Sequence, residues 1–384
     1  MAKHFILTIS DIHNGAKTAE EMANEFYSEG GFMPTLQECV LDKSFLGVAI
    51  TGDYFDKRLD LNDAKTKTAN NIFLEIFNTC KLHKKYFIVL RGTYSHDFSQ
   101  LDNFKNLELN YDRFFLINTV TRLELEDLKI LCLPEEYMHN QEEFYSEYFS
   151  EKYDIILGHG MFKYNCFDAN EAERPMAGMP IFDEQELMRI ANLIVFGHIH
   201  TPSVYKNKIY YNGSYSRLCF GEEDPKGFWL FEYDSKTKKH EADFIENTLA
   251  PTYTTVPLSS LIRKDESSDK IIKIIEKERK KYDNFRVYIS KEYVEKNYAT
   301  VELIKKHFYN KKGIVIQALG FSLKVNKEID SEVPLIENTE YEFLLTEQDL
   351  NKKILRFIEV KYSDKNYDID LDDIKEALSE SKDE

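Results

Sequence analysis

Aspartate and histidine residues recur at five places, four of which include glycines, in the first 200 residues of the 384-residue chain. Each place comes directly after a short apolar run, and the segments are Asp11-Ile12-His13, Gly52-Asp53-Tyr54-Phe55-Asp56, Arg91-Gly92-Thr93-Tyr94-Ser95-His96-Asp97, Gly158-His159-Gly160 and Gly197-His198-Ile199-His200. Carboxylates and imidazoles bind divalent metals of intermediate softness, such as manganese, iron and zinc. A glycine beside a ligand lets the backbone turn sharply and leaves room for a bulky phosphate. The segments therefore predict a metal site that handles phosphate.

Two metal ions fit these residues better than one. A carboxylate can bridge two ions, and ions about 3.5–4 Å apart can activate a water and stabilise phosphoryl charge. We expect a dinuclear site made by Asp11, His13, Asp53, His159, His198 and His200, with His96 as an acid or electrostatic group that binds no metal. Taken alone, Asp53 or Asp56 could be a helix N-cap, and Asp56 could equally orient a ligand. The ordered recurrence of all five motifs favours the metal site.

Strands must position these motifs, because the carboxyl ends of parallel strands meet at one edge of a sheet. Apolar runs that alternate with amphipathic stretches predict an α/β layered domain up to about residue 250. The expected strands are His4–Ile9, Phe45–Thr51, Tyr86–Leu90, Lys129–Leu133, Ile155–Gly158, Leu193–Phe196, Ile209–Asn212 and Phe228–Tyr233. The expected helices include Thr18–Glu29, Ala64–Leu82, Gln141–Phe149 and Asp183–Ile190.

The chain is longer than a single hydrophobic core usually covers, so more than one domain is expected. A second region begins near Pro251 and reads as helix, strand, helix and strand over 267–282, 285–290, 299–309 and 313–325. We expect a catalytic domain over 1–250, an α+β capping domain over 251–340 and a C-terminal segment over 341–384. The last 22 residues carry nine acidic and three basic side chains, which indicates a short helix or a frayed tail.

Charge and cysteine usage narrow the class of protein. The formal net charge of −17 argues against a protein whose whole surface binds nucleic acid, although a local phosphate site remains compatible with it. The five cysteines form no CxxC pair, which predicts reduced thiols in a cytoplasmic protein. The N-terminal apolar run is too short for a signal peptide, and no segment approaches the roughly 20 apolar residues of a membrane span.

The five motifs in this order resemble the calcineurin-like metallophosphoesterase superfamily, whose pattern is Asp-x-His, Gly-Asp-x-x-Asp, Gly-Asn-His-Asp/Glu, Gly-His and Gly-His-x-His. A finer resemblance lies in Tyr211-Asn212-Gly213-Ser214-Tyr215-Ser216-Arg217-Leu218-Cys219-Phe220-Gly221-Glu222 and Lys226-Gly227-Phe228-Trp229. These segments are similar to the stretch after the last metal histidine in SbcD-type DNA repair nucleases. The resemblance covers about residues 1–245. It implies a four-layer α/β/β/α sandwich with a smaller C-terminal α+β capping domain.

The resemblance also implies a role for each site residue. Asp11, His13 and His200 would hold the first metal, and His159 and His198 the second. Asp53 would bridge the two ions, which are expected to be Mn²⁺. His96 would stabilise the transition state or protonate the leaving oxygen.

One motif departs from the family pattern. The family has an Asn ligand directly before its third-motif histidine, whereas this chain has Gly92-Thr93-Tyr94-Ser95-His96. Thr93, Ser95 or a water could take the vacant ligand position. Since a neutral hydroxyl is a poorer ligand than an amide carbonyl, the second metal is expected to bind more weakly. Similar variants occur in phage-type members, which favours a working site.

The expected function is metal-dependent DNA nuclease activity, as exonuclease or endonuclease, in DNA repair or recombination. The resemblance implies an SbcC-type coiled-coil ATPase as partner and a homodimer within a heterotetramer. An apolar stripe over 341–360 could dock that ATPase or could complete the core of the cap. The alternative is a metallophosphoesterase that acts on nucleotides or other small phosphoesters without a DNA partner, and a third reading is a metal-impaired scaffold.

Basic residues near the motifs are candidates for contact with a DNA backbone, or could simply lie on solvated faces. They are Lys57, Arg58, Arg91, Lys163 and the clusters 277–281 and 305–312. Because the net charge is acidic, we expect the chain alone to bind DNA weakly and a partner subunit to supply the grip.

Overall fold

The computed structural model describes residues 3–97, 99–138, 140–165, 178–263 and 266–319. The predicted ATPase-docking stripe over 341–360 and the acidic tail lie outside the described residues.

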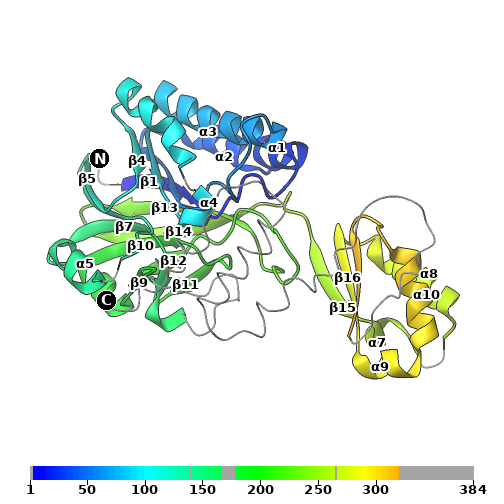
Figure 1. The fold of residues 1–384 in the computed structure, drawn as a ribbon. Helices are drawn as coiled ribbons and strands as arrows, with labels where there is room; N and C mark the ends of the chain where they lie inside the picture. The colour runs from blue at the N-terminus through cyan, green and yellow to red at the C-terminus, as the bar shows by residue number, and fades with distance from the viewer. Residues whose placement is uncertain (1–2, 98, 139, 166–177, 264–265, 320–384) are drawn as a thin grey trace, which may run out of the picture. The chain divides into compact units, whose positions relative to one another are not determined.

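Two six-stranded sheets dominate the described chain (Figure 1). The first sheet has the order β14-β13-β1-β2-β3-β4, with bounds Lys239–Glu246, Gly227–Asp234, Lys3–Ile9, Phe45–Thr51, Tyr86–Leu90 and Phe114–Ile117. The second has the order β11-β12-β10-β7-β6-β5, with bounds Ser203–Tyr205, Ile209–Tyr211, Ala191–Gly197, Tyr153–His159, Leu128–Leu133 and Thr121–Leu125. In the first sheet the strands β1, β2, β3 and β4 run parallel to one another. In the second sheet the strands β6, β7, β10 and β12 do the same. Their carboxyl ends therefore share one edge.

Three apolar clusters show how the layers stack. One joins β1 and β2 to α1 (Ala19–Tyr27), α2 (Phe32–Cys39) and α3 (Ala64–Leu82). A second lies between the two sheets and includes Ala49 and Val195. A third joins the second sheet to α5 (Gln141–Phe149) and α6 (Glu184–Ile190). Helix, sheet, sheet and helix thus form four layers, and the predicted α/β sandwich is confirmed.

Local signals explain where the main helices begin. Thr18 caps α1 in a capping box with Glu21, and the Asp63 side chain accepts from the Lys65 N–H at the start of α3. Such caps satisfy backbone N–H groups that have no partner inside the helix. α3 has the bounds that the sequence predicts, because its cap and its apolar spacing agree.

Short elements connect the layers. They are α4 (Tyr94–Asp97), the 3-10 helices η1 (Leu101–Asn110) and η2 (Lys163–Asn165), and the paired strands β8 (Met161–Phe162) and β9 (Ile181–Phe182). α4 carries the last four residues of the third motif, including His96 and Asp97.

A third sheet lies further along the chain. Its three parallel strands are β15 (Tyr253–Pro257), β16 (Asn284–Ile289) and β17 (Ile314–Ala318). The accompanying helices are α7 (Leu258–Leu261), α8 (Ser268–Arg279), α9 (Lys291–Lys296) and α10 (Tyr298–Phe308). These elements bury their own apolar cluster, which includes Ile275, Val287 and Ile304. The sequence predicted the order of α8, β16, α10 and β17, while the domain boundaries remain a prediction.

Two composition-based expectations bear on the described residues. The cysteines among them, Cys39, Cys80, Cys132 and Cys219, are free thiols. Within the described part of the chain, none of the helices combines the length and apolarity needed to cross a bilayer.

Candidate metal centre

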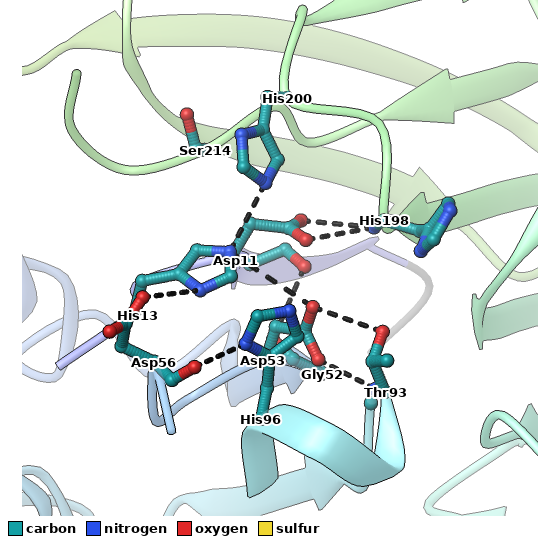
Figure 2. Close-up of polar contacts among 12 residues, drawn as sticks. Asp11, His13, Gly52, Asp53, Asp56, Thr93, His96, His198, His200 and Ser214 are labelled. Atoms are coloured by element: carbon teal, nitrogen blue, oxygen red, sulfur yellow. Dashed lines mark hydrogen bonds and ion pairs between the residues drawn. The ribbon is translucent and has the colours of Figure 1, made fainter. Parts of the chain in front are cut away.

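The carboxyl ends of four strands bring the predicted ligands together. Asp11 and His13 follow β1, Asp53 follows β2, His159 ends β7, and His198 and His200 follow β10. Figure 2 shows Asp11, His13, Asp53, His198 and His200 converging on one place. The β1–β2 and β7–β10 pairs are parallel, so motifs far apart in sequence become neighbours.

The backbone at this edge is strained in a consistent way. Asp11, His13, Asp53 and His198 all have positive φ, at 48°, 49°, 50° and 90°. Such values are uncommon for non-glycine residues, and they persist only where the surrounding structure enforces them. Here the loops after β1 and β2 are joined by hydrogen bonds from the N–H groups of Asp11 to Gly52 O (3.1 Å) and of His13 to Asp53 O (3.1 Å). Strain at four predicted ligands marks a functional site.

Asp11, His13 and His200 form one group, whose donor atoms all lie within 4.8 Å of one another. The Nε2 atoms of His13 and His200 face each other at 3.1 Å (Figure 2). Burial, together with the imidazole of His200, lowers the pKa of His13 well below its usual range. A neutral imidazole is the form that binds metal. These donors fit the first predicted metal.

His159 and His198 form a second group with Glu135, a residue that the sequence did not single out. The Nδ1–H of His159 donates to Thr51 O at 2.7 Å, so its Nε2 is the nitrogen that faces the site. Burial would lower the pKa of His159, but the carboxylate of Asp53 raises it well above its usual range. Glu135 Oε2 lies 3.7 Å from that Nε2 and 3.6 Å from His198 Nδ1. These three side chains are buried.

Asp53 lies between the two groups. Its Oδ2 is 4.0 Å from His13 Nε2 and 3.4 Å from His159 Nε2. Burial alone would raise the pKa of Asp53, but the imidazoles of His159 and His13 outweigh it and the pKa is lowered. An ionised carboxylate in this position can serve both groups at once.

Thr93, not Ser95, lies beside the predicted ligands. The Thr93 N–H donates to Asp53 Oδ1 at 2.6 Å, and its hydroxyl lies 3.2 Å from Asp53 Oδ2 and 3.5 Å from His159 Nε2. Ser95 is exposed on α4. Of the two hydroxyls that the sequence left open, only that of Thr93 reaches the predicted ligands.

His96 stands beside the first group. Its Nδ1 hydrogen-bonds the carbonyl oxygen of Asp56, and its ring meets that of His13 edge-on at 4.7 Å (Figure 2). Since a carbonyl oxygen only accepts, Nδ1 carries the hydrogen. The other ring nitrogen is therefore the one available to exchange a proton.

Asp56 and Asp97 are the two remaining carboxylates of the motifs, and both support neighbouring residues. The N-cap of α3 is Asp63, so neither Asp53 nor Asp56 caps this helix, and the N-cap alternative is wrong. Asp56 Oδ1 lies 3.7 Å from His13 Nδ1. Asp97 is buried and accepts from the N–H groups of Phe55 (3.0 Å) and Gly92 (2.8 Å), which joins the second and third motifs. Burial and the neighbouring Asp53 raise the pKa of Asp97 to about 7.

The donor set suits divalent cations. Asp11 and Glu135 are buried where water cannot solvate a negative charge, and this burial raises the pKa of both carboxyl groups. A bound cation would stabilise the ionised forms of these groups. Mixed carboxylate and imidazole donors fit manganese, iron and zinc.

Glu222 orients one of the histidines. Its Oε1 accepts from His200 Nδ1 at 2.7 Å, and its Oε2 accepts from the Leu218 N–H at 2.7 Å. Burial would raise the pKa of Glu222, but the hydrogen bond from His200 and the charge of Lys226 lower it to about 2. A carboxylate on the far nitrogen of a ligating histidine fixes the tautomer and raises its basicity.

We expect Glu222→Gln to weaken manganese binding about 10-fold, the lower end of the range for partners of ligating histidines. The amide keeps the shape but loses the charge that holds His200. A calorimetric Mn²⁺ titration measures the effect. Glu223→Gln, an exposed neighbour, is the control and should leave the affinity unchanged. Equal affinities for the two variants would contradict the role of Glu222.

Gly197 makes close packing behind the site possible. A Cβ at this position would lie 1.9 Å from Ser10 Oγ, 2.4 Å from Thr51 O and 2.8 Å from His159 Nδ1. Gly197→Ala must therefore push β2 or His159 aside. We expect a loss of about 1–3 kcal/mol in the free energy of unfolding, the usual cost of overpacking. Urea denaturation of the metal-free protein checks this, and an unchanged midpoint would refute the close contact.

The comparisons agree with this site. The calcineurin-like phosphoesterase family matches residues 6–202, about half of the chain and every metal motif. No curated protein matches the chain. One solved structure aligns over 64% of this chain and 100% of its own, with a TM-score of 0.37 and 12% identity. Phosphopantetheinyl hydrolase (PptH) from Mycobacterium tuberculosis aligns over 56% of this chain and 90% of its own, with a TM-score of 0.32 and 11% identity.

Those two likenesses are too distant to bear on activity. The family match, in contrast, begins in β1 and ends just after His200, so it includes strands of both sheets and both ligand groups. The chain therefore belongs to the calcineurin-like phosphoesterase family of metal-dependent hydrolases.

Proposed function

We propose that the chain is a manganese-dependent DNA nuclease of the SbcD type, which hydrolyses phosphodiester bonds in DNA repair or recombination. One observation carries this proposal: the segment that is similar to SbcD-type nucleases contacts the site directly. Glu222 accepts from His200 Nδ1, and Lys226 Nζ donates to the carbonyl oxygen of His200 at 2.8 Å. The features that distinguish this subfamily in the sequence therefore support a metal ligand.

The proposed ligands divide into two sets. Asp11, His13 and His200 hold one ion, and His159 and His198 hold the other, with Asp53 shared between them. When bound, two divalent ions supply a water nucleophile at neutral pH and neutralise phosphoryl charge. The mixed carboxylate and imidazole donors fit manganese, iron and zinc alike, and manganese is proposed because the resemblance to SbcD-type nucleases implies it.

His96 completes the chemistry. In hydrolysis the water oxygen forms a new bond to phosphorus, the bond to the leaving oxygen breaks, and that oxygen needs a proton. The Asp56 carbonyl fixes one nitrogen of His96 as a donor, so the imidazolium form can release the proton of the other nitrogen to the leaving oxygen.

Basic and aromatic side chains near the motifs are suited to contact with DNA. Lys57 and Arg58 are exposed directly after the second motif, and Tyr94, 53% exposed, precedes His96 on α4 by two residues. Cations contact backbone phosphates and aromatic rings stack on bases. Two other basic candidates are engaged elsewhere, because Arg91 donates to Asn118 O and Lys163 pairs with Asp183. With a net charge of −17, the chain is proposed to depend on an SbcC-type ATPase, in a heterotetramer, for firm DNA binding.

The acidic charge also favours a second candidate, a phosphoesterase for nucleotides or other small phosphoesters. A parallel assay separates the two. The purified chain is given Mn²⁺ and either linear duplex DNA, a cyclic nucleotide or bis-p-nitrophenyl phosphate, with and without a co-expressed SbcC-type ATPase. Degradation of linear DNA, increased by the ATPase, supports the nuclease. Rapid hydrolysis of the small esters, with the DNA left intact both with and without the ATPase, would overturn the nuclease proposal.

A further inference from the structure

Glu135 is the acidic side chain of the site that no motif accounts for. It lies two residues after β6, at the same sheet edge as the motifs, and its side chain is fully buried. Its ion-pair partners among the described residues are the imidazoles of His159 and His198. A buried carboxylate is costly unless a partner or a metal compensates its charge.

The distances from the Glu135 carboxylate to the two imidazoles exceed those of hydrogen bonds. Its Oε2 lies 3.7 Å from His159 Nε2 and 3.6 Å from His198 Nδ1, whereas N–H···O bonds are about 2.7–3.2 Å. Donors that share one ion through bonds of about 2.1 Å lie roughly 3–3.5 Å or more apart. All three donor atoms fall within 4.8 Å of one another, which is the arrangement of a ligand set.

Neighbouring groups hold the carboxylate in this orientation. The Tyr137 hydroxyl donates to Oε1 at 2.5 Å, and the Thr93 hydroxyl contacts Oε2 at 3.3 Å. Thr93 stands where the family pattern has its asparagine, and it touches both Asp53 and Glu135. A neutral hydroxyl between two carboxylates serves better as a donor that orients them than as a ligand.

We propose that Glu135 is a ligand of the second cation and replaces, from a different strand, the oxygen that the missing asparagine would supply. Thr93 is then a positioning residue for Asp53 and Glu135. The replacement adds a negative charge to the set of His159, His198 and Asp53. The second ion would therefore bind more tightly than the sequence predicted. This inference rests on the proposed two-metal function.

Metal binding tests the proposal without reference to activity. Mn²⁺ is titrated into the purified full-length chain by calorimetry, and electron paramagnetic resonance then distinguishes coupled Mn²⁺ pairs from single ions. We expect the wild type to bind two ions and to give a coupled spectrum. Glu135→Gln should keep one ion, lose the affinity for the other by at least about 100-fold, and give a single-ion spectrum.

Glu136→Gln is the matched control, because Glu136 is next in sequence but accepts from the Val120 N–H instead of facing the histidines. It should bind two ions like the wild type. Glu135→Asp, which keeps the charge with a shorter reach, should show an intermediate second affinity, and it replaces Glu135→Gln if that variant does not fold. A variant at 135 that binds two coupled ions with wild-type affinity overturns the role of Glu135 alone. A wild type that binds no Mn²⁺ overturns the proposed function itself.

Discussion

His96→Ala is expected to abolish phosphodiester hydrolysis while both metal ions stay bound. The imidazole is held by the Asp56 carbonyl and stands beside His13, where it can donate a proton to the leaving oxygen. Loss of a general acid costs about 10²- to 10⁴-fold in rate. The hydrolysis rate of bis-p-nitrophenyl phosphate, measured on protein with a known metal content, checks the effect.

Analysis of the metal content distinguishes the proton-donor role of His96 from a role as a metal ligand. One nitrogen of His96 also lies within 4.8 Å of donor atoms of His13 and Asp53, which is close enough for a ligand. If His96→Ala loses a metal ion together with activity, His96 is a ligand and the proton-donor role is wrong. His83→Ala, at the C-terminal end of α3, is the control and should keep full activity and both ions.

The sequence predicted the elements whose local and long-range signals agree. β2 and β3 have the predicted bounds because their uniformly apolar runs suit strands buried on both faces. Elements at the edges of the sheets were harder to predict from the sequence. β14 alternates charged and apolar residues and is largely exposed, and β4 has only four residues. α2 begins at Phe32, its N-cap Gly31 offers no side-chain cap, and it contains Pro34, so no local signal predicted this helix.

The site was predictable where ligands occur as motifs and not where a ligand stands alone. Glu135 has no histidine or glycine beside it. Its only signal was its position after a predicted strand whose carboxyl end carries none of the five motifs. Thr93 and Ser95 could not be separated by spacing. The start of α4 at Tyr94 decided between them, because it leaves Thr93 beside Asp53 and Ser95 exposed.

Asp53→Asn is expected to have the largest effect of any single substitution in the chain. The Oδ2 atom of Asp53 faces both groups, at 4.0 Å from His13 Nε2 and 3.4 Å from His159 Nε2. The amide keeps the size of the side chain but removes the charge and offers a single oxygen. We expect both ions to be weakened, with a loss of activity well beyond the 10- to 100-fold typical of partners that only orient a ligand.

Thermal unfolding with and without Mn²⁺ measures this independently of activity, because a ligand that binds only the folded state stabilises it. The wild type should gain stability as Mn²⁺ is added, and Asp53→Asn should not. Asp63→Asn is the control: asparagine caps a helix as well as aspartate does, so α3 and the response to Mn²⁺ should be preserved. If Asp53→Asn responds to Mn²⁺ as the wild type does, the two ligand groups do not share this carboxylate. The dinuclear arrangement proposed for the site would then be wrong.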